Sequence, residues 1–156
     1  MEHFTGGLVT AAGVARWSSG AGGPDRCAKS IQNAKLMAVI LAVEDDLFIL
    51  QSIEWVLDDL GHSALVASDL AGALLHLRAP DHIDALFVDI RLHTEASGGY
   101  EVANQAIALR PQLPVLYTSG SLLTDEMAGS FVCGARFLQK PYSPAQLESM
   151  LGELLH

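Results

Sequence analysis

The strongest constraint on the fold is an alternation of two patterns from Met37 onwards, in which short apolar runs are followed by segments with helical spacing. The runs predict strands near residues 39–43, 64–67, 85–89, 114–117 and 135–139. The other segments predict helices near residues 47–60, 70–78, 100–109 and 124–132, and one after Ser143. Strands that alternate with helices build right-handed βαβ units. The chain from 37 to 156 is therefore predicted to be a three-layer α/β domain with a parallel sheet.

The composition fits one domain with a different kind of segment in front of it. The chain has 156 residues, half of them hydrophobic, which is enough for one substantial core. Residues 1–36 are rich in Gly, Ala and Ser and have no regular periodicity, so we interpret them as a flexible extension. Met37 opens the first strand directly, and a second hypothesis is that it is the true start. Composition leaves both open.

Charge and cysteine content exclude several classes of protein. The net charge is -9, and because residues 1–36 carry about +2, the remainder carries about -11. Without a basic patch, we expect no direct binding to nucleic acid. No apolar stretch reaches the roughly 18 residues of a membrane span. Cys27 and Cys133 form no metal or disulfide motif, which favours the reducing cytoplasm, and Cys133 is expected to be buried.

Polar residues follow four of the predicted strands. Glu44 and Asp45 follow the first, Asp89 ends the third, Ser119 follows the fourth and Lys140 follows the fifth. The carboxyl ends of parallel strands share one edge, so these side chains can converge. Crowded carboxylates need a cation, and Mg²⁺ prefers such oxygen ligands, while a lysine and a hydroxyl suit phosphoryl oxygens. The set predicts an aspartate that accepts a phosphoryl group, although each residue alone could be only a helix cap, a turn residue or a surface charge.

Four motifs, in their order and spacing, resemble the receiver domain of two-component response regulators. They are Glu44-Asp45-Asp46, Val88-Asp89-Ile90, Thr118-Ser119-Gly120 and Lys140-Pro141-Tyr142. The resemblance covers about residue 37 to the end. It implies a flavodoxin-like (βα)5 fold, doubly wound, with strand order 2-1-3-4-5. It also implies a signalling phosphoacceptor rather than a conventional enzyme. Its partners would be a sensor histidine kinase or histidine phosphotransferase and a downstream protein target, and it would be a monomer or weak dimer.

The resemblance assigns roles to the residues around the acceptor. Asp89 matches the phosphoacceptor, and Glu44 and Asp45 match the acidic pair that binds Mg²⁺ with it. The backbone carbonyl of Arg91 matches a further metal ligand. Lys140 matches the lysine that pairs first with the acceptor and then with the phosphoryl oxygens, and its bond to the following proline is often cis in the family.

The resemblance also implies a switch and shows one departure. Ser119 matches the hydroxyl that moves to the phosphoryl group, and Phe137 matches the aromatic residue that turns inward when it moves. Receiver loops commonly have a proline four residues and a glycine eight residues after the acceptor. Here those places hold His93 and Ser97, so the loop 91–99 is expected to be one or two residues longer.

We therefore interpret the chain as a stand-alone response regulator. One alternative is a protein-binding module that keeps the receiver fold but does not depend on phosphorylation, and the retained acids, hydroxyl and lysine argue against it. Another is a Mg²⁺-dependent phosphohydrolase of the haloacid dehalogenase type. That chemistry needs a second aspartate two residues after the nucleophile as acid and base, and this position holds Arg91.

Overall fold

The computed structural model describes residues 37–92 and 98–156, so the predictions for residues 1–36, His93 and Ser97 lie outside the described residues. The elements are β1 (Val39–Val43), α2 (Leu47–Asp59), β2 (Ser63–Ala67), α3 (Leu70–Arg78), β3 (Ala85–Asp89), α4 (Gly98–Leu109), β4 (Val115–Ser119), α5 (Asp125–Gly129), β5 (Arg136–Gln139) and α6 (Pro144–Leu154). Strands and helices thus alternate as the sequence predicts.

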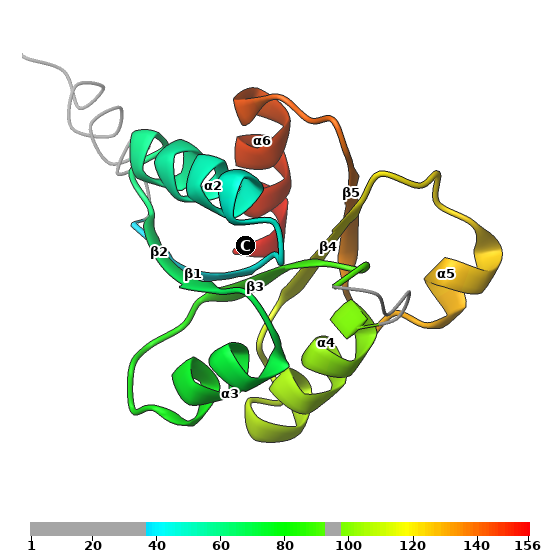
Figure 1. The fold of residues 1–156 in the computed structure, drawn as a ribbon, viewed down its shortest axis with the longest axis horizontal. Coiled ribbons are helices and arrows are strands. Elements are labelled where there is room, and N and C mark those ends of the chain that lie inside the picture. Colours follow the sequence, from blue (N-terminus) through cyan, green and yellow to red (C-terminus); the bar gives the residue numbers. More distant parts are fainter. Residues whose placement is uncertain (1–36, 93–97) are drawn as a thin grey trace, which may run out of the picture. The chain divides into compact units, whose positions relative to one another are not determined.

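The strands form one parallel sheet between two layers of helices. Its order is β2-β1-β3-β4-β5, which confirms the predicted flavodoxin-like topology. Helices α2 and α6 cover one face, and α3 and α4 cover the other (Figure 1). Within the described residues, none of the helices combines the length and apolar character needed to cross a membrane.

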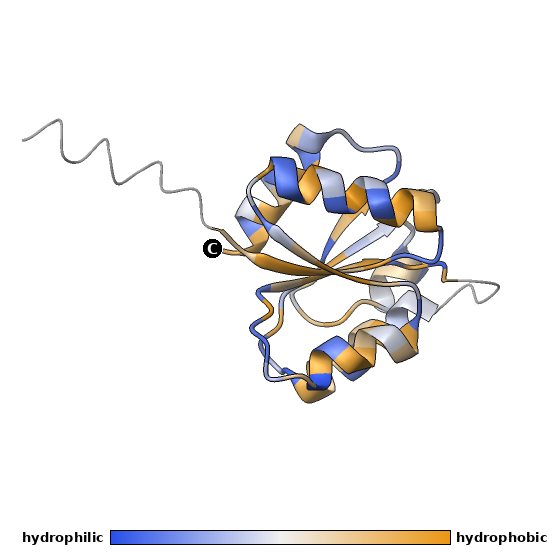
Figure 2. Ribbon diagram, turned by 60° about the vertical axis from the view of Figure 1, so that its left-hand side comes forward, coloured by the Kyte–Doolittle hydropathy of each residue, from blue (hydrophilic) through white to orange (hydrophobic). Residues whose placement is uncertain are grey.

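The apolar runs become strands because each face of the sheet is buried. All five residues of β3 and of β4 are buried, as expected for central strands covered on both sides. Figure 2 shows mostly hydrophobic strands between helices on which hydrophobic and hydrophilic residues alternate. The helices begin at side-chain caps: Asp46 for α2, Asp69 for α3, Thr124 for α5 and Ser143 for α6.

Four sequence predictions differ from the structure. Strand β4 runs to Ser119, two residues beyond its predicted end, because the strand stays buried and paired with β5 that far. Helix α5 ends at Gly129, well before residue 132, because Phe131 and Val132 turn inward to pack in the core. Helix α4 begins at Gly98, two residues earlier than predicted, inside a segment that the sequence indicates as loop. The prediction that Cys133 is buried is wrong, since its thiol is free and exposed just before the turn at Gly134.

Candidate functional site

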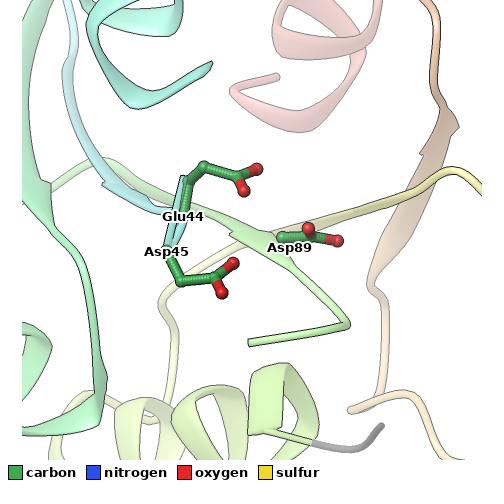
Figure 3. Close-up of side chains that lie close together, drawn as sticks. All are labelled: Glu44, Asp45 and Asp89. Atoms are coloured by element: carbon green, nitrogen blue, oxygen red, sulfur yellow. The ribbon is translucent and has the colours of Figure 1, made fainter. Parts of the chain in front are cut away.

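Three carboxylates meet where β1 and β3 end. Glu44 and Asp45 follow β1, and Asp89 is the last residue of β3. Figure 3 shows Glu44 and Asp45 leaving β1 on opposite sides, with Asp89 next to both. One ligand oxygen from each carboxylate lies within 4.8 Å of the others. Glu44 is only 2% exposed and Asp89 is 8% exposed, so two of these charges are largely removed from water.

Lys140 joins the cluster from β5. Its backbone N–H donates to the carbonyl oxygen of Ser119 at 2.8 Å, which continues the ladder between β4 and β5 by one residue. Its Nζ donates to Glu44 Oε2 at 2.5 Å and to Asp89 Oδ2 at 3.0 Å. The peptide bond between Lys140 and Pro141 is cis. The ammonium thus bridges two buried carboxylates that would otherwise repel each other.

The protonation equilibria follow from this burial and pairing. Burial raises the pKa of the Glu44 carboxyl, and the bond from Lys140 opposes the rise without cancelling it. Burial would lower the pKa of the Lys140 ammonium, but the hydrogen bonds and charges of Glu44 and Asp89 raise it overall. Burial and the same two charges also raise the pKa of the Tyr142 phenol well above its ordinary value. The carboxylates therefore give this edge of the sheet a negative electrostatic potential, which stabilises bound cations and protonated side chains.

The donor set suits a hard divalent cation. Ligand atoms bound directly to one Mg²⁺ at about 2.1 Å lie at most about 4.2 Å apart. The separations of up to 4.8 Å among Glu44, Asp45 and Asp89 need only a small closure, or one water in place of a direct ligand. Arg91 follows Asp89 closely, and its N–H donates to Asp89 Oδ1 at 3.3 Å. The site can accommodate the cation that the sequence predicts.

Ser119 lies at the same edge, on the other face of the sheet from Lys140. It ends β4 and is 1% exposed, and its Oγ accepts a hydrogen bond from the N–H of Ser121 at 3.2 Å. A shallow groove runs past it, lined by Ile90, Arg91, Tyr100, Ser119, Ser121 and Met127. The hydroxyl thus faces α4 and α5, whereas Lys140 and Glu44 lie on the side of α2 and α6.

Phe137 belongs to a set of stacked aromatic rings rather than to the carboxylate cluster. The ring of Phe131 lies 4.4 Å from that of Tyr117 and 6.1 Å from that of Phe137, nearly parallel to both. Tyr100 approaches Tyr117 and Phe131 from α4. Phe131 therefore links the strand that ends in Ser119 to Phe137. We call Tyr100, Tyr117, Phe131 and Phe137 the aromatic stack.

Comparison with known families identifies this arrangement. A family model described as the response regulator receiver domain matches residues 40–152, which is most of the chain. The chain belongs to this family. Among curated proteins, no sequence matches it.

Solved structures of other receiver domains resemble this one over the same region. A response regulator receiver protein from Sinorhizobium medicae is 31% identical, with a TM-score of 0.68 over 76% of this chain and 94% of that one. A CheY-like receiver domain protein from Methanospirillum hungatei is 26% identical, with a TM-score of 0.67. The match covers 77% of this chain and 94% of that one. NtrX from Brucella abortus, solved in complex with ATP, is 26% identical with a TM-score of 0.69, and the match spans 77% of this chain but 27% of NtrX.

Sequence reasoning missed one glycine that this receiver domain needs. Gly99 lies in the first turn of α4, and its N–H donates to the carbonyl oxygen of Ile90 at 2.9 Å. A Cβ there would lie 2.1 Å from the carbonyl oxygen of Asp89 and 2.7 Å from Ile90 Cα. Only glycine lets the helix approach the end of β3 so closely. The signal was the Gly98-Gly99 pair, which we interpreted as loop.

Proposed function

We propose that this chain is a stand-alone response regulator that accepts a phosphoryl group on Asp89 from a phosphohistidine and signals through contact with another protein. The observation that carries the proposal is the bridging of Asp89 and Glu44 by Lys140, beside the carboxylate of Asp45.

Asp89 is suited to act as the nucleophile. In the transfer, an oxygen of Asp89 forms a bond to phosphorus while the bond from phosphorus to the imidazole nitrogen breaks, and the nitrogen keeps the electron pair. Lys140 already lies 3.0 Å from Asp89 Oδ2, so a modest movement of its flexible side chain brings the ammonium to the incoming phosphoryl oxygens. The product is an acyl phosphate on Asp89.

Glu44, Asp45 and Asp89, with the carbonyl of Arg91, would hold a Mg²⁺ ion. When bound, the ion offsets the negative charge of the carboxylates and of the phosphoryl oxygens. The chain's own residues account for the rest: Lys140 neutralises one side of the acceptor, and the Arg91 N–H orients Asp89 Oδ1.

The response to phosphorylation would follow the other face of the sheet. A phosphoryl group on Asp89 adds strong acceptor oxygens at the edge where Ser119 ends β4. Movement of Ser119 toward these oxygens would displace β4, and Tyr117 and Phe131 connect that strand to Phe137. The surface around α5 and β5 would then change and bind a downstream protein. Helix α5 has no buried residue, which suits a segment that moves.

The partners we propose are a sensor histidine kinase or a histidine phosphotransferase, and a protein target. The acidic charge of the chain disfavours direct contact with nucleic acid. The exposed thiol of Cys133 suits a reducing compartment, and we place this activity in the cytoplasm.

Incubation with acetyl phosphate and Mg²⁺ tests the proposal. We expect one acid-stable, base-labile phosphoryl adduct by intact mass, absent from Asp89→Asn and retained by Asp58→Asn, a control at an exposed carboxylate on α2. Chelation of the metal should abolish the adduct. Equal labelling of Asp89→Asn would place the acceptor elsewhere, and no labelling of the wild type by acetyl phosphate or a phosphohistidine donor would favour the phosphorylation-independent module.

A further inference from the structure

Thr118 has a buried hydroxyl that the proposed function does not use. The residue is 1% exposed, and its Oγ1 is the buried side-chain polar atom that has no hydrogen-bond partner among the described residues. Its backbone carbonyl, in contrast, accepts from the N–H of Ile90 at 2.9 Å. A buried hydroxyl without a partner destabilises the folded protein, and valine has the same shape without this cost. The hydroxyl is therefore available to donate a hydrogen bond in another state of the protein.

The strand register places this hydroxyl beside Asp89. Thr118 is the register partner of Asp89 in β3 and of Leu138 in β5, and neighbouring strands lie about 4.8 Å apart. Leu116, two residues earlier, packs in the core under α2 and α6, so Thr118 faces the same side. Lys140 reaches Asp89 from β5 on that side as well. The side chain of Thr118 thus lies beside that of Asp89, on the face of the sheet from which Lys140 approaches.

In the unphosphorylated protein, both oxygens of Asp89 already have donors. Lys140 Nζ donates to Oδ2 at 3.0 Å, and the N–H of Arg91 donates to Oδ1 at 3.3 Å. The outer oxygens of a phosphoryl group on Asp89 carry more negative charge than the oxygen that bridges Asp89 and phosphorus, so the Lys140 ammonium is drawn to the outer oxygens. The oxygen of Asp89 that bears the phosphoryl group then loses its donor from Lys140, and Thr118, the register partner of Asp89, offers a buried hydroxyl beside it.

We propose that Thr118 donates a hydrogen bond to this oxygen of Asp89 during hydrolysis of the acyl phosphate, and so shortens the life of the phosphorylated state. The inference rests on the proposed function of Asp89. In the hydrolysis, a water oxygen bonds to phosphorus and the bond from phosphorus to the Asp89 oxygen breaks. The electron pair of that bond stays on Asp89, which regains its carboxylate charge. One proton of the water remains on the oxygen that now belongs to the phosphate, and the other passes to a phosphate oxygen or to solvent.

The hydroxyl favours hydrolysis because charge builds up on the leaving oxygen only as the bond breaks. The transition state of phosphoryl transfer is loose, so much of this charge is present there. A donor beside the oxygen is then bound more strongly in the transition state than in the acyl phosphate. The free energy of one hydrogen bond to a charged group, gained in the transition state, raises the rate of hydrolysis about tenfold.

Two variants separate the hydroxyl from the shape of the side chain. Thr118→Val keeps the shape and removes the hydroxyl, and Thr118→Ser keeps the hydroxyl and removes a methyl group. The half-life of phosphorylated Asp89 is measured by intact mass after acetyl phosphate is removed, in the presence of Mg²⁺. The stability of each unphosphorylated variant is measured by urea denaturation.

We expect the half-life of Thr118→Val to be about tenfold longer than that of the wild type, with unphosphorylated stability equal or higher. Thr118→Ser should keep the short half-life although it is less stable. Equal half-lives for wild type and Thr118→Val contradict this inference alone, as does a half-life of Thr118→Ser that is as long as that of Thr118→Val. A clear loss of stability in Thr118→Val would mean that the hydroxyl is already bonded, for example to a buried water, and also overturns it. If the wild type takes up no phosphate, the proposed function fails and this inference fails with it.

Discussion

Substitution of Gly99 by alanine should destabilise the domain, although alanine is the better helix former. The added Cβ would lie 2.1 Å from the carbonyl oxygen of Asp89, more than 1 Å inside the 3.4–4 Å of ordinary contact. Its second neighbour is Ile90 Cα at 2.7 Å. Both obstacles are backbone atoms, so no side chain can rotate away. The strain is relieved only if α4 moves about 1 Å from the sheet.

The cost of that movement can be worked out from the structure. Helix α4 has 12 residues, so it is about 18 Å long, and a 1 Å gap under a strip about 6 Å wide is roughly 100 Å³. At about 24 cal/mol per Å³, this cavity costs about 2.5 kcal/mol. The lost bond from the Gly99 N–H to Ile90 costs about 1 kcal/mol, and the helix propensity of alanine returns at most about 1 kcal/mol. We expect a net loss of about 2.5 kcal/mol.

The assay is urea denaturation followed by circular dichroism, with thermal melting as a second measurement. The expected loss lowers the melting temperature by about 10 °C for a domain of this size. Gly152→Ala is the matched control, because a Cβ at that position in α6 meets nothing within 4 Å and should raise stability slightly. Gly98→Ala should fall between the two, since its nearest neighbour is Leu92 Cβ at 3.0 Å. A Gly99→Ala protein as stable as the wild type would refute the steric argument.

Three further predictions concern buried charge. Lys140→Met should lower the free energy of unfolding by about 3 kcal/mol at neutral pH, because it leaves Glu44 and Asp89 buried without their cation. The loss should be smaller in acid, where Glu44 is protonated, and urea denaturation at both pH values checks this. The pKa of Lys140 is raised, so its contribution to stability is complete below the ordinary lysine pKa and is lost as the pH rises through the folded-state value. The difference in stability between wild type and Lys140→Met should therefore narrow in alkali, and a constant difference would contradict the pairing. Arg110→Ala should cost about 2 kcal/mol, because Arg110 donates to three carbonyl oxygens at and after the end of α3 at 2.8–3.0 Å, and Arg110→Lys should not restore stability because an ammonium lacks the planar fork.

The sequence predicted the elements of the fold because burial on both faces leaves a direct trace in it. The central strand Ala85–Asp89 is apolar until its last residue, and that change marks the edge where ligands bind. The position of Asp89 was therefore predictable from sequence. The end of α5 was not, because Phe131 leaves the helix to stack between two other rings, and this depends on contacts with distant strands.

Details of the site depended on tertiary contacts that no spacing reveals. Lys140 bonds to Glu44 as well as to Asp89 because the side chains at these three strand ends lie on the same face of the sheet. The need for glycine at position 99 follows from how closely a helix approaches a strand. The unpartnered hydroxyl of Thr118 is visible only once every buried polar group has been matched with its neighbours.

The sheet itself separates two halves of the molecule that can change independently. Lys140 and Glu44 lie under α2 and α6, whereas Ser119 and the aromatic stack lie under α4 and α5. A substitution in the aromatic stack need not alter the ion pairs of Lys140, and a substitution in α6 need not move the rings of the aromatic stack. Such a domain can diverge in what it recognises around α5 while the carboxylate edge stays the same, and an engineer could exchange the segment from Ser121 to Ala135 on that basis.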